Sequence, residues 1–159
     1  MKLSTREDIE APLSFVFAAF ADVENWERAA MRRGADVVRT DKLQSLGVGM
    51  SWKVNFMYRG KPRTVTAKLA ELERPSHMVY SGLANSLEAT ISLDFVELSA
   101  KRTRITVGTE MKPLTLGARL FLQSLKLAKT KLTKRYEHRV AELCTDIEDR
   151  YRAAQKASV

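Results

Sequence analysis

Few side chains in this sequence have the type and spacing that catalysis or metal binding requires. The chain has two histidines and one cysteine, namely His77, His138 and Cys144. Neither histidine lies in a cluster of ligand-type side chains at metal-site spacing, so no metal site is expected. The motifs GxSxG, GxGxxG and the P-loop do not occur. We therefore expect no cofactor, and we interpret His77 as a turn residue, His138 as a solvated helix residue and Cys144 as a buried, inert thiol.

Glu7 is the polar residue that most invites a functional interpretation. In an extended segment it shares a face with Leu3 and Ile9, so its carboxylate is expected to point inward. A buried carboxylate must be paired, hydrogen-bonded or neutral, because isolated burial is costly. Glu7 is then either an acid–base group or an anchor for a ligand hydroxyl. Alternatively it pairs with a helix arginine, or meets water at the open end of a sheet.

The scaffold that would position such residues begins with a strand that has an aromatic face. In MSWKVNFMYRG, residues 50–60, Trp52, Phe56 and Tyr58 alternate with polar residues, which is typical of a half-buried strand. Similar alternation predicts strands at 3–9, 35–41, 62–72, 77–84, 86–97 and 102–112, separated by short turn signals. Strands that follow one another through such short turns are expected to pair antiparallel.

Helical patterns flank these strands. A first short helix begins after Pro12, Asp22 is the expected N-cap of a second, and Gly34 ends it. From about 115 to 152 apolar residues recur every three or four positions, which predicts one nearly continuous helix. Strands in one block with helices outside it indicate the α+β class, with a seven-stranded antiparallel sheet and two short helices between its first two strands.

Composition narrows the class of protein further. The 159 residues are 45% hydrophobic and 29% charged, which is ordinary globular composition. We expect a single domain over 1–152 with a C-terminal tail over 153–159. The N-terminus has no apolar leader, no apolar run is long enough to span a membrane, and only one cysteine is present. These features favour a soluble, cytoplasmic protein.

The order of these elements resembles the helix-grip fold of the START-like, or SRPBCC, superfamily, which includes polyketide cyclase/dehydrase-like proteins and START lipid-transfer domains. The resemblance depends on IEAPLSFVFAAFADVENW at 9–26, GVGMSW at 47–52, ELERPSHMVYS at 71–81 and TRITVGTEMKP at 103–113. It implies a curved sheet that grips the C-terminal helix, with a cavity between them for an apolar ligand such as a lipid, a quinone or a polyketide.

In that geometry the aromatic strand either lines a gap or fills a core. The small residues Ala67, Gly82 and Ala89 on the presumed inner face favour a gap. Tyr58 and Tyr80 are amphipathic candidates, because a phenol can pack and still donate a hydrogen bond. The predicted ligand-binding residues are Trp52, Phe56, Tyr58, Ala67, Tyr80, Ala89, Ile91, Phe121, Leu125 and Glu7.

The positive charge is concentrated in the predicted C-terminal helix. The net charge is +8, and residues 114–139 carry seven basic side chains against Glu137 alone. The simplest interpretation is a solvated helix face. The alternative is weak contact with an anionic membrane through Lys126, Lys129, Lys131 and Lys134. Nucleic acid is not expected as a partner, because no aromatic residues interleave with these lysines.

Two functions remain open from the sequence. One is the binding or transport of a small hydrophobic ligand. The other is an aromatase/cyclase-type enzyme that acts on a polyketide-like substrate in the same cavity. An enzyme needs an acid or base within reach of its substrate, whereas a carrier needs apolar walls and one or two orienting groups. The scarcity of titratable inward residues favours the carrier.

Overall fold

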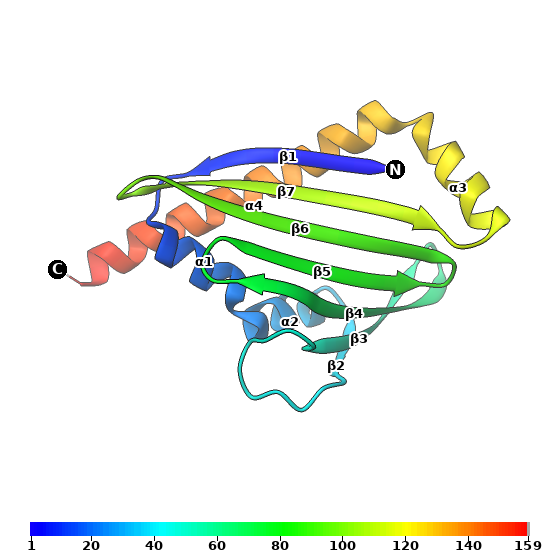
Figure 1. The fold of residues 1–159 in the computed structure, drawn as a ribbon, viewed down its shortest axis with the longest axis horizontal. Helices are drawn as coiled ribbons and strands as arrows, with labels where there is room; N and C mark the ends of the chain where they lie inside the picture. Colours follow the sequence, from blue (N-terminus) through cyan, green and yellow to red (C-terminus); the bar gives the residue numbers. More distant parts are fainter. Residues whose placement is uncertain (159) are drawn as a thin grey trace.

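The computed structural model describes residues 1–158, in which seven strands and four helices are present. Along the chain these are β1 (Lys2–Ile9), α1 (Leu13–Ala21), α2 (Val23–Arg32), β2 (Asp36–Arg39), β3 (Ser51–Tyr58), β4 (Lys61–Glu73), β5 (His77–Ala84), β6 (Leu87–Ser99), β7 (Arg102–Pro113), α3 (Leu116–Lys126) and α4 (Lys129–Ala157). Figure 1 shows this arrangement. The predicted α+β class and the two short helices between the first two strands are confirmed.

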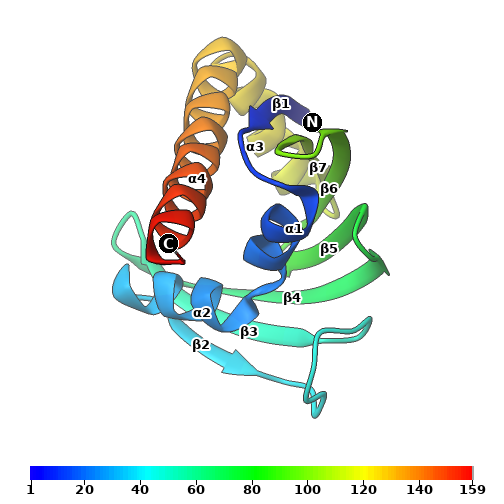
Figure 2. The ribbon, with the colours of Figure 1, turned by 90° about the vertical axis from the view of Figure 1, so that its left-hand side faces the viewer.

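All seven strands form one antiparallel sheet in the order β1-β7-β6-β5-β4-β3-β2. Its register pairs Trp52 with Ala67, Ala67 with Gly82 and Gly82 with Ala89, so these four residues share a face. A β-bulge between Leu69 and Glu71 interrupts the pairing of β4 with β5, and such bulges bend a sheet. The sheet curls from β1 to β2, and α1, α2 and α4 lie on its concave side (Figure 2).

The two short helices form where the sequence predicts them. α1 buries Val16, Phe17 and Phe20, and the rings of Phe17 and Phe20 lie 5.6 and 5.3 Å from that of Phe95 on β6. Asp22 is the N-cap of α2, and its side chain accepts a hydrogen bond from the backbone of Asn25 at 3.2 Å. The aromatic packing fixes α1 on the sheet, while α2 buries no residue completely and lies further out.

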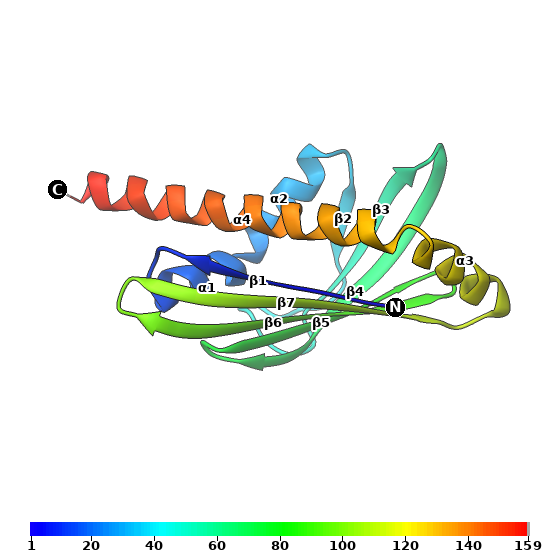
Figure 3. The same ribbon diagram turned by 90° about the horizontal axis from the view of Figure 1, so that it is seen from above.

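The prediction of one nearly continuous helix from about 115 was wrong. The chain turns at residues 127–128, where the backbone N–H groups of Leu127 and Ala128 bond to carbonyls three residues back. α3 packs Ala118 and Leu122 at the end of the sheet, next to β7, whereas α4 lies along β1. Figure 3 shows that the two helices run in different directions, so one straight helix could not serve both contacts.

α4 is the long helix against the sheet, and it continues to Ala157, beyond the predicted end at 152. It buries Val140, Cys144 and Ile147. Polar contacts fix it at two points: the hydroxyl of Tyr136 lies 3.0 Å from that of Thr109, and a Glu148 carboxylate oxygen accepts from the backbone N–H of Glu10 at 2.9 Å. Within residues 1–158 no helix has the length and apolar character needed to cross a membrane.

Candidate functional site

A cavity of about 440 Å³ lies between the concave face of the sheet, α2 and α4. Its sheet wall is formed by Val37, Trp52, Val54, Ala67, Tyr80, Ile91, Leu93 and Val107. Its helical wall is formed by Phe20 of α1, by Val23, Trp26, Glu27 and Ala30 of α2, and by Val140 and Leu143 of α4. Both the volume and the apolar lining are those of a small-molecule pocket.

The cavity exists because the concave face is wider than the helices that cover it. Ala67 stands between Trp52 and Gly82 in the register, so the sheet presents two small residues side by side there. The ring of Trp52 leans toward Tyr80, with the ring centroids 6.0 Å apart.

The inward side chains of the concave face become more exposed toward one end of the sheet. Along β6 the exposed fraction of the inward side chains rises from 3% at Phe95 and 7% at Leu93 to 39% at Ile91, and Ala89 and Leu87 beyond it are partly exposed. The same trend runs along β3, from buried Trp52 to exposed Tyr58. Both trends lead to the end where β3, β5 and β7 finish and α3 begins, which we call the mouth end.

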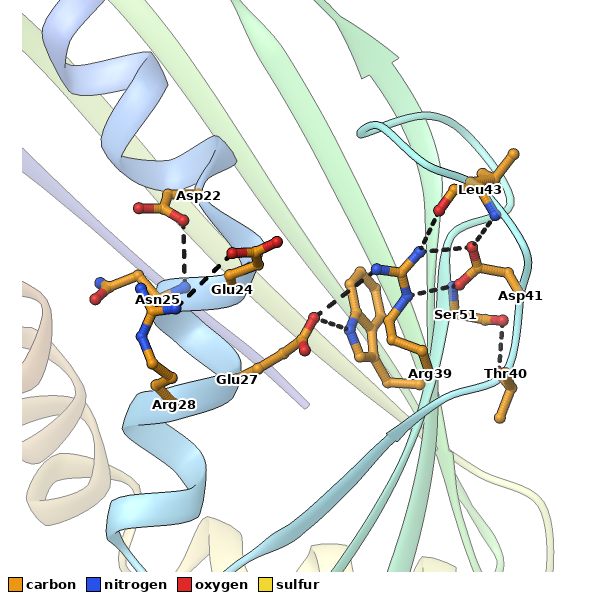
Figure 4. A network of polar contacts seen from close by, with 11 residues as sticks. Asp22, Glu24, Asn25, Glu27, Arg28, Arg39, Thr40, Asp41, Leu43 and Ser51 are labelled. Atoms are coloured by element: carbon orange, nitrogen blue, oxygen red, sulfur yellow. Dashed lines mark hydrogen bonds and ion pairs between the residues drawn. The ribbon is translucent and has the colours of Figure 1, made fainter.

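Glu27 is the one carboxylate in the lining, and it is tied to the opposite wall. Its Oε1 atom accepts a hydrogen bond from the indole Nε1 of Trp52 at 3.2 Å and lies 3.9 Å from a guanidinium nitrogen of Arg39. These contacts join α2 to β2 and β3 across the edge of the cavity. Figure 4 shows the network from α2 to the loop after β2.

Arg39 is in turn held by the loop that precedes β3. Its guanidinium donates to both carboxylate oxygens of Asp41, at 2.9 and 2.7 Å, and to the carbonyl of Leu43 at 3.1 Å. Asp41 also accepts from the backbone N–H groups of Leu43 and Ser51. The Arg39 guanidinium and these N–H groups hold the pKa of Asp41 well below its usual range. The pair therefore stays ionised and keeps Glu27 in place.

Tyr80 supplies the second polar group of the lining. Among residues 1–158 its hydroxyl has no hydrogen-bond partner, and burial raises the pKa of Tyr80 to about 12. The phenol therefore stays protonated at neutral pH and can donate one hydrogen bond to a molecule in the cavity. With Glu27 on the facing wall, the site offers one donor and one acceptor within an apolar enclosure.

Four of the ten predicted ligand-binding residues line the cavity: Trp52, Ala67, Tyr80 and Ile91. The other six do not. Phe56, Tyr58 and Ala89 lie on the same face of the sheet but further toward the mouth end. Phe121 and Leu125 belong to α3, which the turn at 127–128 carries away from the concave face.

Glu7, the sixth, faces α4 rather than the cavity. It lies close enough to Cys144 that its charge, after burial, contributes to raising the pKa of that thiol to about 12. Cys144 is buried, as the sequence suggests. An inward-pointing carboxylate is thus present, but it belongs to the contact between β1 and α4.

Sequence reasoning missed most of the helical wall. Val23, Trp26 and Ala30 are three and four residues apart and face the cavity together. This spacing is readable in the sequence and could have identified α2 as a wall. The contribution of Glu27 had no such signal, because its partners Trp52 and Arg39 are distant in the chain.

Neither histidine is near the cavity. His77 opens β5 on the convex face, where its ring nitrogens lie 2.7 Å from Asp94 and 3.5 Å from Glu71. His138 on α4 is exposed and pairs with Glu142 at 2.8 Å. Among residues 1–158, no three histidine, cysteine or carboxylate side chains are arranged to hold a metal ion.

The sequence matches no family model, and no curated protein is significantly similar to it. Solved structures are similar in three dimensions. The Zhui aromatase/cyclase of a Streptomyces species superposes with a TM-score of 0.68 at 16% identity, over 97% of each chain. A Thermus thermophilus protein gives a TM-score of 0.65 at 14% identity, over 97% of this chain and 99% of its own.

This chain has the helix-grip fold. Norcoclaurine synthase from Thalictrum flavum has it too, with a TM-score of 0.62 at 10% identity, over 79% of this chain and 82% of its own. At such identities the likeness concerns the fold. The helix-grip prediction from the sequence is confirmed, and the cavity described above lies between the sheet and the helices that it grips.

Proposed function

We propose that this protein binds a small hydrophobic ligand in the cavity between the sheet, α2 and α4. The observation that carries this proposal is the cavity itself, which is about 440 Å³ in volume and lined almost entirely by apolar side chains. An empty apolar cavity sacrifices contact energy, so a fold that maintains one is best explained by an occupant. A lipid, a quinone or a polyketide-like molecule has the required chemistry.

The two polar groups of the lining restrict the chemical class of the ligand further. The phenol of Tyr80 offers a donor, and the Glu27 carboxylate an acceptor already shared with Trp52. An apolar body with one carbonyl or hydroxyl group fits this lining. A ligand carboxylate does not, because it would approach the charge of Glu27 without a free cation in the lining.

Native mass spectrometry of the protein purified from its own host tests this proposal. We expect a species heavier than the 18.0 kDa chain by the mass of one small molecule. The uncharged fluorophore N-phenylnaphthylamine should also bind to ligand-free protein and be displaced by the extracted molecule. Bare protein in the spectrometer together with no binding of the fluorophore would contradict the proposal.

A second candidate is an aromatase/cyclase-type enzyme, which the Streptomyces neighbour of that name favours. Glu27 is the only carboxylate of the lining and could act as its base. Its contacts with Trp52 and Arg39 argue against this role, because a base must reach the substrate. Conversion of a linear poly-β-ketone by the wild type but not by Glu27→Gln would favour the enzyme; unchanged substrate with measurable binding would favour the carrier.

We also propose weak contact of Lys126, Lys129, Lys131 and Lys134 with an anionic membrane surface. All four side chains are exposed, and none of them forms an ion pair among residues 1–158. Binding to anionic vesicles should be measurable at low salt and should weaken as salt rises. Binding that is insensitive to salt would contradict an electrostatic contact.

We propose that the protein is located in the cytoplasm. The single buried thiol of Cys144 supports this, because a chain with one cysteine cannot form an intrachain disulfide in an oxidising compartment. Cell fractionation with detection of this chain tests the assignment, and recovery only with secreted proteins would overturn it.

A further inference from the structure

We propose that the mouth end docks on an anionic lipid bilayer, with the exposed leucines of α3 and of the turn after it inserted among the lipid headgroups. The inference deepens the membrane contact proposed above and rests on it. It adds which face docks, which apolar side chains enter the bilayer, and why the inward side chains become exposed there.

α3 is apolar on two opposite sides. Ala118 and Leu122 face the protein. On the other side Leu116 and Leu120 share a face of α3, because positions four residues apart lie on the same side of a helix, and Leu127 follows in the turn after α3. These three side chains are 71%, 58% and 92% exposed. A helix with unpartnered leucines and neighbouring lysines has the character of an interfacial membrane helix.

A second exposed tip lies at the same end of the molecule. The β3–β4 hairpin turns through Arg59 and Gly60, which both have positive φ, and it presents Met57 and Tyr58 to solvent. Figures 1 and 3 both place this hairpin and α3 at the end where β7 finishes. Exposed apolar side chains thus flank the exposed end of the concave face from two separate elements.

The positive charge near this face favours an anionic binding partner. No acidic residue occurs between Glu110 and Glu137, a segment with seven basic residues, or between Asn55 and Ala67, a segment with three. The other side chains of these two segments are neutral. Glu88 on β6 is an exposed acidic residue at this end, so the surface combines exposed leucines with an excess of cations, which complements anionic headgroups above an apolar interior.

The same charge argues against the alternatives. A second copy docked through this face would bring two surfaces with an excess of positive charge together, at an electrostatic cost. A nucleic acid would satisfy the lysines, but it would leave the exposed leucines in water. A bilayer satisfies both features.

The docking would bring this exposed end of the concave face to the lipid surface. An apolar ligand could then pass between the bilayer and the cavity without crossing water, where its apolar surface is costly to expose. On β6 the exposed fraction rises from Leu93 to Ile91 in the direction of this surface. The docking surface and the ligand path therefore coincide.

Vesicle flotation measures the docking. Wild-type protein should float with vesicles of phosphatidylcholine and phosphatidylglycerol at seven to three, and not with phosphatidylcholine alone. Two combined variants test the contributions of charge and of apolar insertion. The lysine variant changes Lys126, Lys129, Lys131 and Lys134 to glutamine. The leucine variant changes Leu116, Leu120 and Leu127 to serine. Each should reduce the partition coefficient roughly tenfold or more, because one basic residue near the surface contributes about fivefold and each inserted leucine loses the burial of its apolar carbons.

Matched controls carry the same chemical changes away from the mouth end. The charge control changes Lys42, Lys68, Lys101 and Lys156 to glutamine, and the apolar control changes Val38, Val96 and Leu98 to serine. All these side chains are exposed. Controls that bind vesicles like the wild type support the proposal, whereas equal losses in controls and test variants overturn it, because net charge or general hydrophobicity would then explain the binding.

Insertion is read directly at Leu127. In Leu127→Cys labelled with an environment-sensitive fluorophore, emission should shift to the blue on anionic vesicles, while the same label at Val96→Cys should not respond. Cys144 is buried and should stay unlabelled. Flotation without a shift at position 127 would overturn insertion while leaving the lysine contact standing.

The remaining outcomes are also decisive. A concentration-dependent dimer that the leucine variant abolishes, without vesicle binding, would identify a second copy as the occupant and overturn the bilayer. Binding of a DNA duplex in preference to vesicles would overturn it as well. Binding of N-phenylnaphthylamine is measured without vesicles, so failure of the ligand proposal is distinguishable from failure of docking.

Discussion

Ala67→Phe should fill the cavity and block ligand binding while leaving the fold intact. Ala67 lines the cavity between Trp52 and Gly82, so a ring attached there enters open space. If half of an aromatic side chain contacts the wall, about 100 Å² of apolar surface is newly buried, which contributes about 2.5 kcal/mol. Ordering the ring costs about 0.5–1 kcal/mol. The free energy of unfolding should therefore not fall, and it should rise by at most about 1.5–2 kcal/mol.

The same substitution in a filled part of the core is the control. Ala11 is completely buried and does not line the cavity. Ala11→Phe should overpack the contact between α1 and the sheet and lower the free energy of unfolding by about 1–3 kcal/mol or more. The comparison isolates empty space as the variable, because both changes add the same atoms.

Urea unfolding and titration with N-phenylnaphthylamine are the two assays. We expect Ala67→Phe to keep the wild-type unfolding midpoint and to bind the fluorophore at least tenfold more weakly. The reasoning is refuted if Ala67→Phe is destabilised as strongly as Ala11→Phe and the wild type binds no fluorophore. The space at Ala67 would then be core and not a container.

Three further predictions concern single groups. Asp94, with Glu71, raises the pKa of His77, so this pairing stabilises the fold below about pH 6.5 and is lost as pH rises through the folded-state pKa. The free energy of unfolding of the wild type should therefore fall above that pH. An identical pH profile in His77→Gln would contradict this. Burial raises the pKa of Cys144 to about 12, so a thiol reagent at pH 8 should modify it only after denaturant is added. Rapid labelling of the native protein would contradict a buried, protonated thiol. Tyr80→Phe should leave the unfolding midpoint nearly unchanged, because the phenol has no partner among residues 1–158. The same change should weaken the binding of a carbonyl ligand about two- to tenfold. Equal affinity would show that Tyr80 does not orient the ligand.

The fold was predictable from the sequence because its signals are local. Alternation with period two marks each strand, and Asp22 and Gly34 mark the bounds of α2. The turn between α3 and α4 was not predictable from the same kind of signal. The apolar spacing continues through residues 127–128, and only the competing contacts of α3 with β7 and of α4 with β1 require the chain to turn.

The cavity was predictable in part for a related reason. The alternation of side chains along a strand places Trp52 and Ala67 on the concave face, but it does not say how far the helices extend over that face. Tyr58 is on the same face as Trp52 by this alternation and yet lies exposed in the β3–β4 hairpin. The contact of Glu27 with Trp52 joins residues 25 positions apart and depends on where α2 docks, which no local pattern encodes.

Methyl NMR during titration with N-phenylnaphthylamine tests the central claim most directly, because it locates the ligand residue by residue. We predict that the methyl signals of Val54, Ile91 and Leu143 shift, since all three residues line the cavity from different elements. The signals of Ile9 and Ile147, which are buried outside the lining, should stay unchanged. Shifts confined to the leucines of α3, or no shift at any cavity methyl group, would contradict the account.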